Sequence, residues 1–153
     1  MDTHEKEIEK ILKELLDILE IKAKISFSDK TDERLNVTLE GENLGLLIGF
    51  RGETLNAVQL FLEIALYRKV NEWVPVTLDI AGYRKEREEQ VKKLAEKFCD
   101  RAKFFAKSVE LAPMSSYDRM IVHTVVSTFP GLKSESTGEG KFRRVIISPV
   151  LKP

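Results

Sequence analysis

A glycine-cornered turn stands between two apolar segments in the first half of the chain, and its sequence is GFRG at residues 49–52. Glycine at each corner permits positive φ and leaves no Cβ in the way of a close approach. Apolar residues at helical spacing from Leu55 to about Lys69 predict a helix that begins at Gly52. The free N–H groups and the positive dipole end of that helix would face the turn. The turn therefore predicts a helix start that is open to an anion.

The segments around this turn follow helix and strand periods. Apolar residues at helical spacing predict a helix over residues 5–20. Alternating residues at 25–27 and 35–39 predict a β-hairpin, with SDKTDE as its turn. A short apolar helix leads into the glycine turn, and residues 74–80 predict a third strand, which Pro75 leaves partly unpaired near its start.

The second half of the chain predicts a long helix followed by a smaller helix and two strands. The long helix spans about residues 84–108, which corresponds to roughly 37 Å. The pattern Ser115-x-x-Asp118 predicts a capped helix to about Thr128. Strands follow near residues 133–136 and 143–147, joined by a Gly138-Glu139-Gly140 turn. The predicted buried stripe of the long helix is Val91, Leu94, Ala95, Phe98, Ala102, Phe105, Ala106 and Val109.

Composition limits the class of protein and divides the chain by charge. The 153 residues are 42% apolar, which is enough for a core, and the charged N-terminus does not resemble a secretory signal. The chain has one cysteine and no apolar run of membrane-spanning length, so we expect a cytoplasmic protein without membrane insertion. Residues 1–82 hold 10 Lys and Arg against 16 Asp and Glu, whereas residues 83–153 hold 15 against 9. The basic half therefore faces either a polyanion or the acidic half.

The glycine turn has the features of a phosphate-binding loop. Arg51 adds a cation that can follow a phosphate, and Ile48 and Leu55 can form an apolar floor for unstacked bases. The sequence does not end in Gly-Lys-Ser/Thr, as a nucleotide-binding P-loop does. A dinucleotide site is also disfavoured, because a strand would have to lead directly into the glycines.

The longer stretch LIGFRGETL, residues 47–55, resembles the signature of the KH domain. The order of the surrounding elements is similar to the type II KH arrangement, α-β-β-α-α-β, and the resemblance covers about residues 5–81. It implies that single-stranded RNA is clamped by Ile48, Gly49, Phe50, Arg51, Gly52 and Leu55.

A second polar group is predicted on the helix that follows Ser115. Arg119 and His123 are four residues apart and so share one helix face, where together they could grip a phosphate, with the imidazole gaining charge beside the anion. Ser115 and Asp118 are interpreted as helix caps, which makes a catalytic triad with His123 improbable. With two histidines and one cysteine, a zinc site is not expected either.

The wider stretch from ELAPMSS to RRVIIS resembles the R-three-H domain over about residues 84–149. Arg119 and His123 fall on the two positions that name that domain, whose family binds single-stranded nucleic acid. The glycine turn near residue 140 looks like its closing hairpin. Lys141, Arg143 and Arg144 would add to the same basic surface.

The two modules in this order resemble the bacterial Jag family of sporulation-associated proteins. The fold class is then α+β: a type II KH domain at residues 1–82 and a small α/β R-three-H domain at residues 83–153, joined by the long helix. The resemblance implies an RNA chaperone or post-transcriptional regulator linked to cell elongation and envelope homeostasis. It implies binding of single-stranded RNA, or single-stranded DNA, and pairing with a small single-KH protein.

Many members of this family carry an additional N-terminal Jag-N domain, so the chain is expected to be a short form or a truncated one. The alternative function is a protein-interaction scaffold with weak or no RNA affinity, which the acidic first half would suit, and KH modules can also form homodimers. An enzyme is not expected, and neither a cofactor nor a metal is expected, because the sequence lacks a nucleophile–base pair or ligand cluster at a workable spacing.

Overall fold

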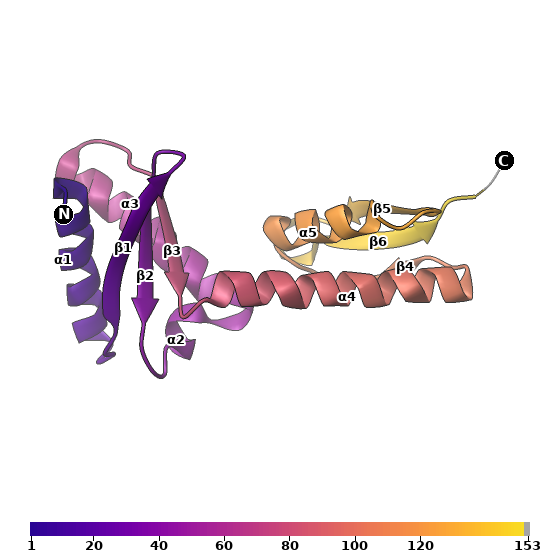
Figure 1. The fold of residues 1–153 in the computed structure, drawn as a ribbon, viewed down its shortest axis with the longest axis horizontal. Helices are drawn as coiled ribbons and strands as arrows, with labels where there is room; N and C mark the ends of the chain where they lie inside the picture. The colour runs from indigo at the N-terminus through magenta and orange to yellow at the C-terminus, as the bar shows by residue number, and fades with distance from the viewer. Residues whose placement is uncertain (152–153) are drawn as a thin grey trace. The chain divides into compact units, whose positions relative to one another are not determined.

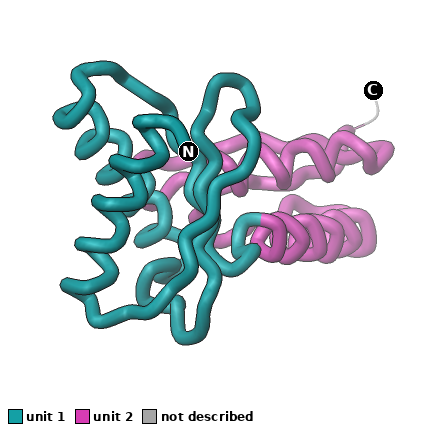
Figure 2. The backbone as a smooth tube through the Cα atoms, turned by 60° about the vertical axis from the view of Figure 1, so that its left-hand side comes forward, with its two compact units in different colours: residues 1–84 teal, residues 85–153 magenta. Residues whose placement is uncertain are grey.

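The computed structural model describes residues 1–151, which fold into two compact units. Unit 1 comprises residues 1–84 and unit 2 begins at residue 85, so the division falls in the first turn of helix α4 (Figure 2). The elements of unit 1 are α1 (Thr3–Ile18), β1 (Lys24–Thr31), β2 (Arg34–Glu40), α2 (Gly45–Ile48), a 3₁₀ turn (Phe50–Gly52), α3 (Glu53–Val70) and β3 (Val76–Ile80).

The three strands of unit 1 form one sheet in the order β1-β2-β3 (Figure 1). β1 and β2 form the predicted antiparallel hairpin, and β2 pairs with β3 in parallel, with Leu35 opposite Val76. The hairpin is longer than predicted, because β1 runs to Thr31 and only Asp32 and Glu33 turn, both with positive φ. Two such residues suit the tight turns that match strand twist. Pro75 lies just outside β3, and its carbonyl accepts a hydrogen bond from the Leu35 N–H.

The core of unit 1 lies between one face of this sheet and helices α1 and α3. Alternate residues of β2 and β3 are buried, as expected for strands with a single covered face. Helix α1 begins with a reciprocal capping box between Asp2 and Glu5. The core side chains from these elements are Ile8, Leu12, Leu16, Leu35, Val37, Leu39, Leu55, Leu62, Leu66, Val76, Leu78 and Ile80.

Unit 2 packs helices α4 and α5 with a second three-stranded sheet. Its elements are α4 (Tyr83–Phe105), β4 (Val109–Glu110), α5 (Ser116–Val126), β5 (Leu132–Thr137), a 3₁₀ turn (Gly140–Phe142) and β6 (Arg144–Pro149). The strand order is β4-β6-β5, and β6 is antiparallel to both neighbours. The buried side chains are Val91, Ala95, Cys99, Ala102, Leu111, Ile121, Val122, Val126, Val145 and Ile147.

The predicted stripe of the long helix was wrong at its C-terminal end. The helix ends at Phe105, and Ala106 has a left-handed backbone with a φ of 49°. The prediction had extended the helix to about residue 108. Phe105 is consequently exposed, whereas Cys99, which the prediction omitted, is buried.

The fold class is the predicted one. Unit 1 has the predicted element order α-β-β-α-α-β, and unit 2 is a small mixed helix and strand unit. Within residues 1–151, no helix combines the length and the apolar character that crossing a bilayer requires.

Candidate nucleic-acid interface

The Gly49–Gly52 loop is a tight connection between α2 and α3. Helix α2 ends at Gly49, which has a φ of 70°, and α3 begins after Gly52, which has a φ of 77°. Arg51 between them also has a left-handed backbone, with a φ of 53°. Both glycines thus adopt the positive φ that glycine permits, and these angles turn the chain sharply into the first turn of α3.

The space left by the two glycines is filled by the protein itself. A Cβ at Gly49 would overlap the Thr54 hydroxyl and would lie 2.7 Å from Thr54 Cβ. A Cβ at Gly52 would lie 2.8 Å from Cε1 of Tyr83. The glycines therefore shape the loop by close internal packing, which the sequence interpretation had attributed to room for a phosphate.

The two middle residues present a ring and a cation to solvent. The Phe50 side chain is 70% exposed, and the Arg51 Cζ lies 4.8 Å from its ring centroid, within the range of a cation–π contact. No described side chain caps the N-terminus of α3, which follows directly at Glu53. The loop thus combines an exposed aromatic surface, a guanidinium and an uncapped helix start.

The expected apolar floor is only half present. Ile48 is half-buried and packs against the core from the end of α2. Leu55 is 1% exposed and belongs to the core, so the prediction that it lines a floor for bases was wrong. Within the first turn of α3, its side chain packs into the core of unit 1.

His123 bridges helix α5 and strand β5. Its Nδ1 lies 2.7 Å from the hydroxyl oxygen of Ser134, and its Nε2 lies 2.8 Å from that of Ser136. Burial, and secondly the charge of Arg119, lower the pKa of His123 below its ordinary value of 6.5. In the ligand-free protein the lowered pKa favours the neutral imidazole, which joins α5 to β5, and the gain of charge beside a bound anion stays a prediction.

Arg119 and Arg143 meet at the backbone of Met114, just before α5. The Arg119 Nε donates a hydrogen bond to the Met114 carbonyl at 3.3 Å, and the Met114 N–H donates to the Arg143 carbonyl at 3.1 Å. The Arg143 guanidinium in turn donates to the Gly138 carbonyl at 2.8 Å. The structure thus brings together the start of α5 and the β5–β6 connection, as the sequence predicted.

The remaining two predicted cations differ in their surroundings. Arg144 pairs with Glu110 across β6 and β4, so much of its charge is compensated within the sheet. Lys141 is exposed, and its Nζ lies 5.3 Å from the ring centroid of Phe142. Phe142 is itself 63% exposed. The sequence analysis missed this ring, although an aromatic residue between Lys141 and Arg143 was a signal for it.

A buried ion pair fixes α5 against α4 within unit 2. Asp118 is 4% exposed, and one of its carboxylate oxygens accepts hydrogen bonds from Arg87 Nε at 3.1 Å and Nη2 at 2.9 Å. The predicted cap is confirmed, since the Asp118 N–H donates to the Ser115 hydroxyl at 3.2 Å. Asp118 thus orients the helix that carries Arg119 and His123.

Neither a metal-ligand cluster nor an exposed thiol is found in the described residues. A search of residues 1–151 finds no cluster of three His, Cys, Asp or Glu side chains placed to hold a metal ion. The free thiol, Cys99, is buried, and burial raises its pKa. What the two surfaces offer is cations beside exposed phenylalanine rings.

Two family models match the chain, one in each unit. The model described as KhpA/KhpB, KH domain matches residues 5–78, and the model of the R-three-H domain matches residues 89–149. The two matches are consecutive and correspond to the two predicted modules.

Curated relatives match both modules together. A protein of Clostridium symbiosum named RNA-binding protein KhpB is 34% identical over 138 residues, covering 90% of this chain and 62% of that protein. Proteins of the same name from Bacillus subtilis and Streptococcus pneumoniae are 39% and 28% identical over 78% and 87% of this chain, and 57% and 40% of their own lengths. The chain spans about three fifths of the first two. With a KH and an R-three-H match in this order, the chain belongs to the KhpB family, which is the Jag family that its sequence resembles.

Proposed function

We propose that this protein binds single-stranded RNA in the cytoplasm, through the Gly49–Gly52 loop of unit 1 and the β5–β6 connection of unit 2. The observation that carries the proposal is the exposed Phe50 ring with Arg51 beside it at an uncapped helix start. Relatives named RNA-binding protein KhpB support the same class of ligand. The chaperone or regulatory role implied by the resemblance would be exerted through this binding.

The loop supplies three kinds of contact to one nucleotide step. An unstacked base can lie on the Phe50 ring, as bases do on aromatic platforms of single-strand binding proteins. The neighbouring phosphate meets the Arg51 guanidinium and the N–H groups at the start of α3. Glu53 in the first turn opposes an anion there, so we assign the loop more to positioning than to affinity.

The second contact repeats the pairing of ring and cation. Phe142 and Lys141 are exposed at the 3₁₀ turn before β6, and Arg143 and Arg119 lie around the Met114 backbone nearby. Because both contacts belong to one chain, the second becomes intramolecular once the first has formed. Such linkage raises avidity by roughly 100-fold or more where the geometry allows both contacts.

The loop is tested by Phe50→Asp with Arg51→Asp in the full chain. Asp tolerates the left-handed backbone at position 51, so the fold should persist. We expect weaker binding of a labelled single-stranded RNA in fluorescence anisotropy, with an unchanged circular dichroism spectrum. The matched control is Ile18→Asp with Lys10→Asp, which makes the same change in charge at exposed positions of α1. Equal affinities of both variants and the parent would remove the loop from the proposal.

We further propose that unit 1 pairs with another KH-domain protein through helix α3. This helix is apolar on two sides, since one stripe enters the core and a second remains exposed. A helix that is apolar all round is normally buried. Trp73, just after the end of α3, packs beside Tyr67, with ring centroids 6.2 Å apart, and extends the exposed stripe. The exposed side chains are Leu60, Phe61, Ile64, Tyr67 and Trp73.

Light scattering tests the pairing. The parent chain should form a homodimer when measured alone, or a heterodimer when mixed with a small single-KH protein. Phe61→Glu with Ile64→Glu should abolish it, because two charges would be buried in an apolar interface. Phe50→Asp with Arg51→Asp serves as the control that should leave pairing intact. A parent that stays monomeric in both samples would contradict this part of the proposal.

A further inference from the structure

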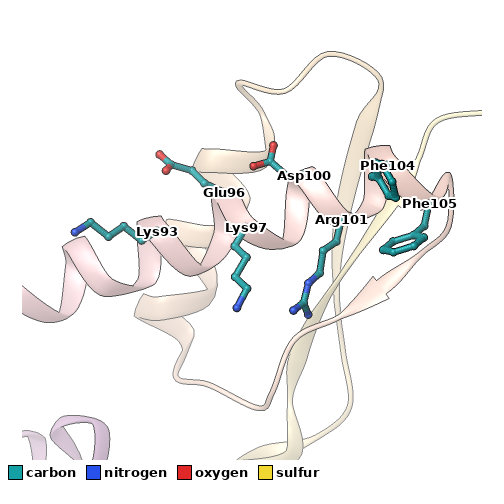
Figure 3. A pocket seen from close by; sticks show the side chains of 7 residues that line it. All are labelled: Lys93, Glu96, Lys97, Asp100, Arg101, Phe104 and Phe105. Atoms are coloured by element: carbon teal, nitrogen blue, oxygen red, sulfur yellow. The ribbon is translucent and has the colours of Figure 1, made fainter.

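A row of cations on helix α4 ends at two exposed phenylalanines. Lys93, Lys97 and Arg101 are each four residues apart, and Phe105 follows at the same spacing. Each step rises about 6 Å and turns about 40° around the helix, so the row of four side chains winds gradually along α4. With Glu96, Asp100 and Phe104 they line an open pocket of about 600 Å³ (Figure 3).

The two rings contribute little to the fold. Phe104 is 83% exposed and Phe105 is 60% exposed, with their centroids 4.9 Å apart in an edge-to-face pair. The core of unit 2, within the described residues, includes Phe98 and Phe129 but neither of these rings. An exposed aromatic pair loses the free energy that burial of such side chains would provide. Its presence at the end of a cationic row indicates a ligand.

The cations of the row are available to an anion. In the described part of the chain, no ion pair joins Lys93, Lys97 or Arg101 to a carboxylate, although Glu96 and Asp100 are close in sequence. Figure 3 shows why: Lys97 and Arg101 point to one side of α4, and Glu96 and Asp100 point to the other. The Arg101 Cζ lies 5.1 Å from the Phe98 ring centroid, which holds its guanidinium on the cationic side.

We propose that this row and the Phe104–Phe105 pair form an additional contact for single-stranded nucleic acid, separate from the loop and from the Arg119–His123 region. The phosphates would run along Lys93, Lys97 and Arg101, and one or two bases would stack on the rings at the end of the helix. The proposal rests on the proposed function, since it extends the RNA-binding surface of the same chain.

Charge decides between nucleic acid and a protein as the occupant. A groove of aligned cations that leads to stacking rings is the combination by which proteins hold single strands without sequence preference. A protein that docked on the two rings would need carboxylates to meet the row of cations. Residues 83–153, which include all of unit 2, are the basic part of the chain, with 15 Lys and Arg against 9 Asp and Glu.

The test uses the full chain and a fluorescein-labelled oligouridine of about 20 nucleotides, titrated at several salt concentrations. Phe104→Leu with Phe105→Leu keeps an apolar surface but removes stacking, so we expect affinity to fall roughly tenfold with an unchanged salt slope. Lys97→Gln with Arg101→Gln removes two phosphate contacts, so the log–log salt slope should flatten by about 1.4.

Two controls match these changes. Ile18→Ala with Leu19→Ala shortens two exposed apolar side chains at the end of α1 in unit 1, and Lys6→Gln with Lys10→Gln removes two exposed lysines of α1. Both should bind oligouridine as the parent does. Ultraviolet crosslinking of the parent, which requires no variant to fold, should label the peptide that carries Phe104 and Phe105.

The outcomes separate the two proposals. If the parent binds oligouridine and the leucine variant binds equally well, the α4 contact is overturned and the proposed function stands. If the parent does not bind RNA at all, both fail. A weakened leucine variant together with a crosslinked Phe104–Phe105 peptide establishes the contact.

Discussion

The imidazole of His123 is held between two serine hydroxyls, with its Nε2 2.8 Å from the Ser136 oxygen. The other nitrogen contacts Ser134, two residues earlier on β5, so one ring joins two successive inward-facing positions of the strand to helix α5. One of the motif's two naming residues thus acts as a structural tie, and Arg119, one helical turn away, remains the cation of the pair.

This arrangement predicts that stability depends on pH through His123. Because the folded pKa is lowered, the unfolded chain takes up a proton near the ordinary value of 6.5 while the folded protein stays neutral. The stabilising contribution is therefore complete above about pH 6.5 and is lost as pH falls through the lowered folded pKa. Urea unfolding of the parent and of His123→Gln from about pH 7.5 to about pH 5.5 measures it. The difference between the two proteins should shrink on acidification, and a constant difference would contradict the prediction.

Loss of Arg87 should destabilise unit 2 severely. Arg87→Met leaves the Asp118 carboxylate buried without its partner, which costs roughly 3–5 kcal/mol. Adding Asp118→Leu should recover much of this loss, because the pair is then replaced by apolar groups. Unfolding followed by circular dichroism measures both variants. Trp73, the single tryptophan, reports on unit 1 and provides the internal control.

The glycines of the loop should differ from other glycines in their response to alanine. Gly49→Ala combines a left-handed φ with overlap on Thr54, so we expect a loss of about 2–4 kcal/mol. Gly82→Ala carries a similar φ, but its Cβ would meet no described atom within 4 Å, so about 1–2 kcal/mol is expected. Gly45→Ala, with neither problem, should change stability by less than about 1 kcal/mol. Thermal unfolding orders the three, and equal effects at Gly49 and Gly82 would show that the overlap with Thr54 relaxes freely.

Arg119 should act as one phosphate contact. Arg119→Ala should flatten the log–log salt dependence of single-stranded RNA binding by about 0.7, the value for one contact to a single strand. Its Nε hydrogen bond to Met114 is made with one edge of the guanidinium, so a small loss of stability should accompany the change. A lowered stability with an unaltered slope would assign Arg119 to structure alone.

Phe142 should stack a base. Phe142→Ala is expected to weaken RNA binding by roughly 5- to 100-fold at any single salt concentration, whereas Phe142→Tyr should retain most of the affinity. Because the ring is exposed, neither change should alter the melting temperature. If alanine and tyrosine variants bind alike, the ring does not contact RNA.

Local sequence patterns predicted the elements of the fold because each pattern is compatible with only one kind of secondary structure. Alternation in β2 and β3, helical spacing in α1 and the Ser115 cap all appear in the structure as expected. The errors arose where tertiary contacts decide. Phe105 continues the apolar period of α4, yet the helix ends there and its side chain is exposed. The spacing of apolar residues does not show that the core ends before Phe105.

The candidate site was predictable in location but less so in chemistry. Gly49, Gly52, Arg119 and His123 could be placed by motif and spacing alone. The neutral state of His123 could not, because it depends on two serines from a strand eleven and thirteen residues later in the chain. The inward side chain of Leu55 and the pairing of Arg144 with Glu110 likewise depend on packing between elements that are distant in sequence.

The internal packing of the two loop glycines has a consequence for how this loop can vary. Since Thr54 and Tyr83 occupy the space beside them, the corners are fixed by folding, and selection for a different ligand cannot act there without loss of stability. Phe50 projects into solvent and is free to change, while the left-handed backbone at Arg51 favours a narrower set of residues such as Asn, Asp or Gly alongside Arg. The loop therefore separates evolvable positions from structural ones within four residues, so that affinity for RNA can be raised or lowered at position 50 while the domain itself remains unchanged.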